Sequence, residues 1–235
     1  MERKVHKHLF ITGANRGIGL CFVKEYLSNG WQVTACCRDP SKATQLLELQ
    51  RSNPQLLIAK LDLEQLEQTN LNSLQIPRQK IDLVINNAGY YGPKGVNFAD
   101  INLNEWRKVL EVNTIVPLLL THQLFQAGHL SNPCTIAFVS SKVGSMADNR
   151  SGGGYYYRSS KAALNSIVKS LAIDLLSHNI KTVALHPGWV KTDMGGPNAL
   201  IDPETSVIGM QQVISSLTEQ QSGSFIDYQG KTIPW

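Results

Sequence analysis

The residues best suited to proton transfer are Tyr157 and Lys161, which stand four positions apart in a segment with helical spacing. Residues four apart on a helix project from one face, with Cβ atoms about 5–6 Å apart. A free tyrosine has a pKa near about 10, and a neighbouring ammonium group lowers that pKa toward neutrality. Each of the two tyrosines before Tyr157 has a serine at the corresponding position. The spacing therefore selects Tyr157 as a candidate proton donor, although such a pair also arises by chance.

A glycine-rich loop supplies a candidate binding site. Gly13, Gly17 and Gly19 directly follow an apolar run and precede a helical pattern. Glycine turns tightly and lets the backbone approach a pyrophosphate, while the first turn of a helix offers free N–H groups and a positive dipole end. We therefore expect a dinucleotide here, with a simple connecting turn as the alternative. The residues expected to contact it are Gly13, Asn15, Arg16, Gly17, Ile18 and Gly19.

The charge at the end of the second predicted strand indicates which dinucleotide is bound. Arg38 stands where an acidic residue would bind the ribose 2′-hydroxyl of NAD, whereas arginine suits the 2′-phosphate of NADP. Arg16 adds a second cation for the same phosphate. Asp39 is followed by Pro40, so we expect it to cap the next helix instead of binding ribose. The sequence therefore favours NADP(H) over NAD(H).

Short apolar runs alternate with helical patterns along the chain. The runs predict strands at residues 8–12, 32–37, 56–61, 81–86, 135–140, 181–186 and 224–227. The helical patterns cover residues 18–28, 41–51, 104–125, 157–176 and 204–217. Pro117 is expected to kink the third of these helices. The alternation predicts an α/β fold: a single doubly wound parallel sheet (Rossmann fold) with helices on both faces and the ligand at the carboxyl ends of the strands.

Length and composition point to one domain. The 235 residues are 42% hydrophobic and no repeat or linker divides them, so residues 1–235 are expected to form one NAD(P)-binding Rossmann domain with a built-in catalytic site. The net charge of +4 accompanies no nucleic-acid-binding module, and Arg3, Lys4 and Lys7 are expected to form a solvated tail. We therefore expect no nucleic acid as a partner.

The apolar stretch near the N-terminus is too short for a signal peptide or a membrane span, so we expect no membrane as a partner and a cytoplasmic protein. The four cysteines show no metal-ligand spacing. Cys36 and Cys37 are adjacent in a predicted strand, where their side chains point to opposite faces. We expect four reduced thiols and no metal.

Together these motifs resemble the short-chain dehydrogenase/reductase family, and the match runs along nearly the full chain. The glycine loop is similar to the cofactor signature of that family, and residues 86–89 match its Asn-Ala-Gly element. By this resemblance, further cofactor contacts come from Asp62, Leu63, Asn87, Ala88, Gly89, Pro187, Gly188, Val190 and Thr192, together with Arg38, Tyr157 and Lys161. The resemblance also implies a catalytic set of Asn113, Ser141, Tyr157 and Lys161.

Within the family, residues 146–154 and 228–235 are similar to the C-factor and sniffer-type carbonyl reductase branch. Ser141 precedes Tyr157 by more residues than is usual in the family, so a glycine-rich insertion lies beside the site and could cover the substrate. Ser140 is an alternative to Ser141 as the catalytic serine. Ser141 is favoured because the family serine stands three residues before a glycine, here Gly144.

The resemblance implies hydride transfer from NADPH to a small carbonyl compound, an aldehyde or ketone. Tyr157 would donate a proton to the developing alkoxide, and Ser141 would orient that oxygen. Lys161 would lower the pKa of Tyr157 and bind the nicotinamide ribose, and Asn113 would anchor a water for reprotonation. In the alternative, structural interpretation, Ser141 simply ends a strand and Asn113 is a polar helix residue satisfied by backbone.

Two alternative functions remain open. One is an NADP-binding signalling protein of the C-factor type with little turnover. The other is an alcohol dehydrogenase that works in the oxidative direction, which the same residues would serve. Arg38 is the one feature that bears on direction, because NADPH usually drives reduction.

Three loops are expected to form the substrate pocket. Loops at 90–94, 143–156 and 194–200 are expected to line it.

Two helices suggest that the chain assembles. The helices at 104–125 and 157–176 carry apolar residues over more than one face, and the resembling family commonly pairs these helices across a two-fold axis. These residues include Leu118, Leu119, Leu120, Leu164, Ile167, Val168, Leu171 and Leu175. We expect a homodimer or homotetramer, with burial inside one chain as the alternative.

Overall fold

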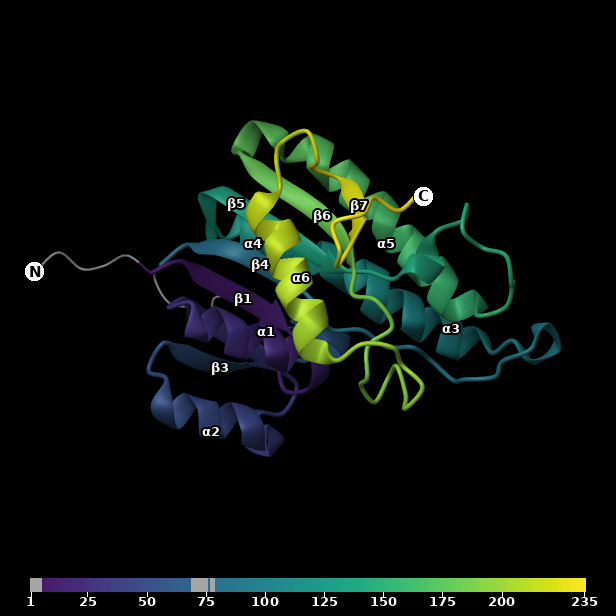
Figure 1. The fold of residues 1–235 in the computed structure, drawn as a ribbon, viewed down its shortest axis with the longest axis horizontal. Coiled ribbons are helices and arrows are strands. Elements are labelled where there is room, and N and C mark those ends of the chain that lie inside the picture. The colour runs from purple at the N-terminus through teal and green to yellow at the C-terminus, as the bar shows by residue number, and fades with distance from the viewer. Residues whose placement is uncertain (1–5, 69–75, 77–78) are drawn as a thin grey trace, which may run out of the picture.

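The computed structural model describes residues 6–68, 76 and 79–235. Arg3 and Lys4, which were assigned to a solvated tail, lie outside these residues. The described strands form one seven-stranded sheet in the order β3-β2-β1-β4-β5-β6-β7, and neighbouring strands are parallel (Figure 1). They are β1 His8–Thr12, β2 Gln32–Cys37, β3 Leu56–Lys60, β4 Ile81–Asn86, β5 Leu130–Val139, β6 Ile180–His186 and β7 Ser224–Asp227. The predicted doubly wound α/β sheet is confirmed.

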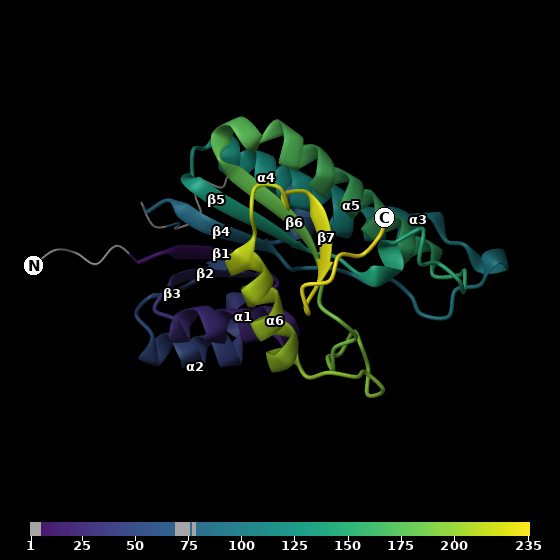
Figure 2. The ribbon, with the colours of Figure 1, turned by 45° about the horizontal axis from the view of Figure 1, so that its top comes forward.

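Helices cover both faces of the sheet (Figures 1 and 2). One face carries α1 Gly17–Ser28, α2 Thr44–Ser52 and α6 Pro203–Ser216, and the other carries α3 Leu103–Leu110, α4 Val116–Gln126 and α5 Tyr155–Asp174. An apolar core fills the space on each side. Cys36 packs into one core and Cys37 into the other, because side chains alternate along a strand. The expected opposite orientation of the two thiols is confirmed.

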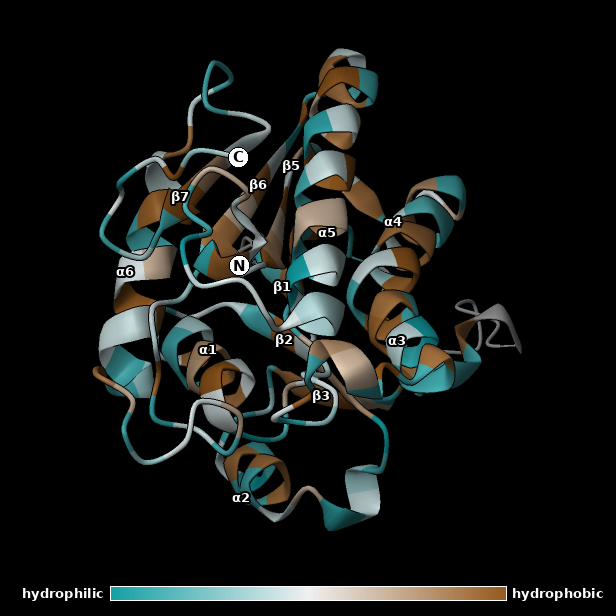
Figure 3. Ribbon diagram, turned by 90° about the vertical axis from the view of Figure 1, so that its right-hand side faces the viewer, coloured by the Kyte–Doolittle hydropathy of each residue, from teal (hydrophilic) through white to brown (hydrophobic). Residues whose placement is uncertain are grey.

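The central strands are apolar on both sides. β1 is buried at each of its positions, and β2 at all but its first. A parallel sheet with helices on both faces needs this pattern, since neither side of such a strand meets water. Figure 3 views the molecule from the side on which the strands end, and much of the strands and of α4 is brown, the colour of hydrophobic residues. The same view shows the loops that follow the strands, where a ligand is expected.

The helical pattern predicted over 104–125 is divided into three pieces. α3 ends at Leu110, residues Glu111–Ile115 form a π-helical turn, and α4 begins at Val116. Pro117 lacks the N–H group that would donate to the fourth residue before it, Asn113. The helix was expected to kink at Pro117, and the structure instead has a wider, π-helical turn just before this residue. Asn113 is buried in that turn.

Other element boundaries differ by a few residues from the prediction. The helix expected over 41–51 starts as a 3-10 turn, Pro40–Lys42, and becomes α-helical at Thr44. Asp39 caps that turn as expected, since its Oδ1 accepts a hydrogen bond from the Ser41 N–H at 3.1 Å. α5 begins at Tyr155 instead of residue 157, and β5 begins at Leu130 instead of residue 135. End residues carry weak periodicity, so their assignment depends on tertiary contacts.

Four of the eight apolar residues that suggested an assembly are already buried within this chain. Leu120, Leu164, Val168 and Leu175 are buried in the core beneath α4 and α5, and the other four are half-buried. The assembly therefore stays a prediction.

Within residues 6–68, 76 and 79–235, none of the helices combines the length and apolar character that crossing a membrane requires. In the same residues the four cysteines are free thiols, and no cluster of His, Cys, Asp or Glu suits a metal.

Candidate active site

A cleft of about 830 Å³ lies at the carboxyl ends of the strands, and most of the predicted site residues line it. Those that line it are Gly13, Asn15, Arg16, Gly17, Ile18, Gly19, Arg38, Asp62, Leu63, Asn87, Ala88, Gly89, Tyr157, Lys161, Pro187 and Thr192. Asn113, Ser141, Gly188 and Val190 are not part of the lining. Predicted residues from six separate segments of the sequence therefore meet at one surface.

The glycine loop lies too close to its neighbours for side chains. Gly13 has a φ of +63°, and a Cβ there would stand 2.9 Å from the Ala88 Cα. A Cβ on Gly19 would stand 2.2 Å from the Gly13 carbonyl oxygen. The Asn87 side-chain amide donates to the Thr12 and Gly13 carbonyl oxygens at 2.9 and 3.1 Å, so the loop is fixed against the end of β4. A bare backbone at the start of α1 fits a pyrophosphate, because the helix N-terminus attracts an anion.

Each of the two arginines at the cleft has an acidic partner that sequence reasoning did not name. Arg16 Nη1 lies 2.8 Å from Asp193 Oδ2, which follows Thr192 in the loop after β6. Arg38 Nη1 lies 3.5 Å from Glu64 Oε1, and Lys108 Nζ from α3 lies 3.3 Å from the other oxygen of Glu64. Asp193, Glu64 and Lys108 also line the cleft. The sequence offered one signal for Glu64: it stands two residues after Asp62, which was expected to contact the cofactor.

Tyr157 and Lys161 lie together on α5, as their spacing predicts. Lys161 Nζ stands 5.6 Å from the centre of the Tyr157 ring and donates to the Val139 carbonyl oxygen at 2.8 Å. Burial lowers the pKa of Lys161 to about 8. Burial also raises the pKa of Tyr157 above its ordinary value, and the nearby Tyr91 adds to this. The expected lowering of the Tyr157 pKa is therefore wrong, because burial outweighs any effect of a lysine whose ammonium donates to the Val139 carbonyl oxygen.

The structure gives the two adjacent serines different surroundings. Ser140 is buried, and its hydroxyl bonds to the Asn165 side-chain oxygen at 2.6 Å. Ser141 is half-buried, and its hydroxyl oxygen accepts from the Val143 N–H at 3.4 Å. Ser140 lines the cleft and Ser141 does not. The Ser140 hydroxyl donates to Asn165, whereas the Ser141 hydroxyl only accepts in this contact, which favours Ser141 as a donor to a substrate. The choice of Ser141 as the catalytic serine stays a prediction.

Asn113 uses its whole side chain to hold the segment after β4. Its Oδ1 accepts from the Tyr90 N–H at 2.8 Å, and its Nδ2 donates to the Tyr90 carbonyl oxygen at 2.8 Å and to the Ser160 hydroxyl at 3.0 Å. Asn113 is fully buried in the π-helical turn. The side chain therefore fixes the backbone beside Gly89, whose added Cβ would stand 3.8 Å from Lys161 Nζ.

Two of the four predicted residues outside the cleft lining, Gly188 and Val190, shape the loop after β6. Gly188 has a φ of +83°, and a Cβ there would stand 2.7 Å from an Ile201 side-chain carbon. Val190 is buried and pairs with Ile201 through a parallel bridge. These contacts place Pro187 and Thr192 at the cleft, where Thr192 lies against Gly17.

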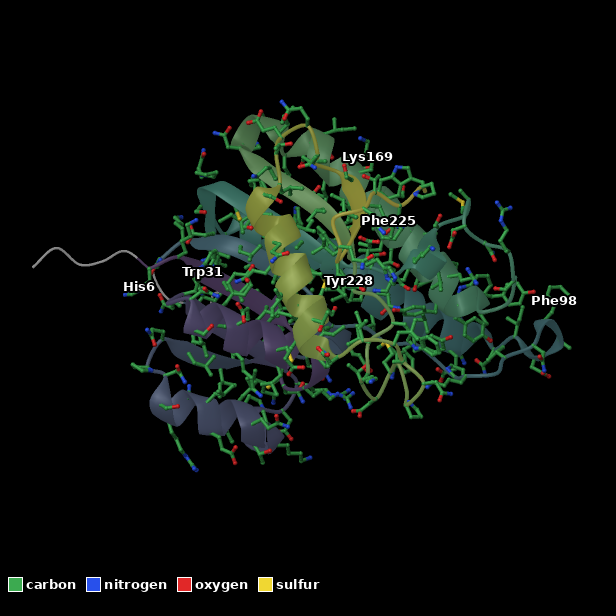
Figure 4. All side chains as sticks on the ribbon, viewed as in Figure 1. His6, Trp31, Phe98, Lys169, Phe225 and Tyr228 are labelled. Carbon is green, nitrogen blue, oxygen red and sulfur yellow. The ribbon has the colours of Figure 1, made fainter. Side chains whose placement is uncertain are left out.

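An aromatic neighbour lies against Tyr157. The Tyr91 ring stands 4.7 Å from the Tyr157 ring, a neighbour that sequence reasoning did not identify although it named the loop. Lys94 Nζ lies 6.0 Å from the Tyr91 ring centre and 3.4 Å from the Met194 carbonyl oxygen, so the loops at 90–94 and 194–200 meet. Figure 4 shows that Phe98, later in the first loop, lies at the far tip of the molecule.

The glycine-rich insertion is joined to α5 next to Tyr157. Residues 149–155 are exposed, and Arg158 holds the segment by donating to the Ser151 hydroxyl at 2.9 Å and to the Val143 carbonyl oxygen at 3.1 Å. These bonds connect the insertion to α5, one residue beyond Tyr157. Whether the insertion covers a substrate stays a prediction.

Comparisons with known proteins agree with this arrangement. The family model for short chain dehydrogenase matches residues 7–200. The C-signal protein of Myxococcus xanthus is 42% identical over 155 residues, which cover 66% of this chain and 93% of the relative. An uncharacterized oxidoreductase of Schizosaccharomyces pombe, C663.09c, is 32% identical and covers 98% of both chains.

Two solved structures are similar over the whole fold. The carbonyl reductase Sniffer of D. melanogaster has a TM-score of 0.86 at 34% identity and covers 98% of this chain and 100% of its own. The NADPH-bound carbonyl reductase from chicken fatty liver has a TM-score of 0.84 at 33% identity and covers 98% and 99%. The similarity inferred from the motifs, including the C-factor and sniffer-type branch, is confirmed.

Proposed function

This chain belongs to the short-chain dehydrogenase/reductase family of oxidoreductases, and we propose that it reduces a small aldehyde or ketone with hydride from NADPH. The observation that carries the proposal is that Tyr157 and Lys161 line the same cleft as the glycine loop. A proton donor and a dinucleotide site on one surface are what carbonyl reduction requires. Two similar structures are those of carbonyl reductases, which supports the reductive direction.

The cleft has the donors and the space that NADPH needs. The close backbone at Gly13 and Gly19 would hold the pyrophosphate, and Arg16 and Arg38 would hold the 2′-phosphate. Asp62 and Leu63 would border the adenine, and Asn87 to Gly89 the adenosine ribose. Pro187, Gly188, Val190 and Thr192 would hold the nicotinamide amide. When bound, NADPH supplies the hydride for the carbonyl carbon.

The chain's own residues supply the proton and orient the carbonyl. The Tyr157 hydroxyl donates its proton to the carbonyl oxygen as negative charge develops there, and the Ser141 hydroxyl donates a hydrogen bond to that oxygen. Lys161 places its ammonium 5.6 Å from the Tyr157 ring centre, where it attracts the phenolate that proton donation leaves behind, while burial still decides the direction of the tyrosine pKa shift. Lys161 would also donate a hydrogen bond to the nicotinamide ribose. Asn113, through the backbone that it fixes, anchors a water from which Tyr157 regains its proton.

We further propose that residues 1–235 work as one domain in the cytoplasm, as a homodimer or homotetramer. The seven strands form a continuous sheet, and the four thiols are free, which suits a reducing compartment. The half-buried residues of α4 and α5 leave apolar surface for a second copy.

The test is to follow NADPH fluorescence in the presence of a panel of aldehydes, diketones and quinones. We expect consumption by the wild type and a loss of about a hundredfold or more in Tyr157→Phe, with NADPH still bound. Tyr155→Phe is the matched control, since Tyr155 is exposed and lies outside the cleft lining, and its activity should match the wild type. NADPH binding without consumption of any carbonyl would favour the signalling alternative. Turnover with NADP and secondary alcohols alone would favour the oxidative one.

A further inference from the structure

The chain after β7 folds back along that strand. Residues 230–235, here called the return segment, follow a turn in which Asp227 Oδ1 accepts from the N–H groups of Gln229 and Lys231, both at 2.9 Å. The Ile233 N–H then donates to the Phe225 carbonyl oxygen at 2.8 Å, and the Trp235 ring stacks on the Phe225 ring with centres 5.8 Å apart. Figures 1 and 4 show Phe225 on β7 and the segment running from it toward α5. The return segment is therefore fixed to the sheet.

The residues that follow β5 form a compact turn, here called the serine turn, from Ser141 to Ser145. The Gly144 N–H donates to the Ser141 carbonyl oxygen at 2.8 Å, and the Ser145 N–H to the Lys142 carbonyl oxygen at 3.0 Å. A Cβ on Gly144 would stand 2.8 Å from the Cβ of Lys161. The turn thus lies directly against α5 at the catalytic lysine, and its first residue is Ser141.

The return segment holds the far end of the serine turn. The Ser145 hydroxyl is buried and donates to the Pro234 carbonyl oxygen at 2.5 Å. The same oxygen of Ser145 accepts from the Asp148 N–H at 3.1 Å, and the Ala147 N–H donates to the Trp235 carbonyl oxygen at 3.0 Å. Two hydrogen bonds therefore join the start of the insertion to a segment fixed on β7, and a third fixes the Ser145 hydroxyl within the insertion.

We propose that the Ser145 hydroxyl and the return segment are positioning elements that fix Ser141 for the carbonyl oxygen, an inference that rests on the proposed function. Two backbone hydrogen bonds make the serine turn stiff, so a shift of Ser145 moves Ser141 relative to Tyr157. A displacement of about 1 Å in a reacting group can cost up to roughly a hundredfold in rate. Ser145, Pro234 and Trp235 do not line the cofactor cleft, so NADPH binding should not depend on them.

The test is a double-mutant cycle between Ser145→Ala and Ser141→Ala, measured as kcat and KM for one carbonyl substrate at saturating NADPH. We expect Ser145→Ala to lower kcat by roughly tenfold in the wild-type background and by less than about twofold in the Ser141→Ala background. The dissociation constant of NADPH should stay within about twofold in every variant. Ser215→Ala is the control, since it removes a hydroxyl that donates to the Gln212 carbonyl oxygen at 2.9 Å on the last turn of α6. Its kcat should be unchanged.

The outcomes separate this inference from the proposed function. An equal loss from Ser145→Ala in both backgrounds, or a kcat within twofold of the wild type, would overturn the positioning role while the reductase activity stands. A wild type without activity, or Ser141→Ala with full activity, would instead contradict the proposed function. If Ser145→Ala does not fold, Trp235→Leu gives the same cycle at a partly exposed position, and the same two results decide it.

Discussion

Cofactor choice depends on Arg38, and replacing it by aspartate should invert the preference. The Arg38 side chain is 72% exposed, and its contact with Glu64 is long at 3.5 Å. An exposed ion pair of this kind is worth about 0–1 kcal/mol, so it competes only weakly with a bound phosphate. A charge-assisted hydrogen bond to a 2′-phosphate contributes about 1.5–3 kcal/mol. The difference, about 0.5–3 kcal/mol, corresponds to roughly twofold to 160-fold in NADPH affinity when the guanidinium is removed.

The assay is kcat/KM with NADPH and with NADH for wild type, Arg38→Ala and Arg38→Asp. Arg38→Ala should weaken NADPH binding by the factor given above and leave kcat/KM with NADH nearly unchanged, because NADH has no 2′-phosphate. Arg38→Asp should also repel the phosphate and offer an acceptor to the free ribose hydroxyl, so NADH should become the better cofactor. Lys42→Asp makes the same charge change at an exposed lysine outside the cleft lining, and it should keep the wild-type preference.

The result that would refute this reasoning is a wild type that prefers NADH, or an Arg38→Asp variant whose preference equals that of the wild type. An equal loss in Lys42→Asp would show that net charge, and not the site, decides the choice. Raising the salt concentration should narrow the difference between the cofactors, since the arginines at the cleft are exposed and screened by ions.

Three further predictions test the loop, the acid stability and the assembly. Gly19→Ala should reduce NADPH affinity and lower the melting temperature, because its Cβ would stand 2.2 Å from the Gly13 carbonyl oxygen. Equal NADPH binding in wild type and Gly19→Ala would contradict the close packing. Burial lowers the pKa of His186 to about 4, so between about pH 6.5 and 4 the unfolded chain binds a proton that the folded chain does not, and stability should fall as the pH drops through that window. Thermal unfolding of wild type and His186→Asn over a pH series measures this. Equal slopes of melting temperature against pH in the two proteins would count against it. Light scattering at micromolar concentration should give the mass of a dimer or tetramer, and a monomer mass would leave burial within one chain as the explanation of the apolar helix faces.

Features that depend on neighbouring residues were predicted from the sequence. Tyr157 and Lys161 share a face because the helix repeats every 3.6 residues, whatever surrounds it. The glycine loop follows from its place between an apolar run and a helix start, and the sheet follows from the alternation of runs and helical patterns. Asp39 caps its turn because the side chain reaches an N–H two residues away. Backbone sterics and local hydrogen bonds are enough to decide each of these.

Features that join distant parts of the chain were decided by tertiary packing. Arg16 meets Asp193 across 177 positions, and Ser145 meets Pro234 across 89, and neither pairing has a local signal. The pKa of Tyr157 rises where spacing alone predicted a fall, because desolvation depends on everything packed around the ring and not only on Lys161. Spacing along the chain thus determines which side chains can act together, whereas burial and long-range contacts determine how far each one is charged and where it is held.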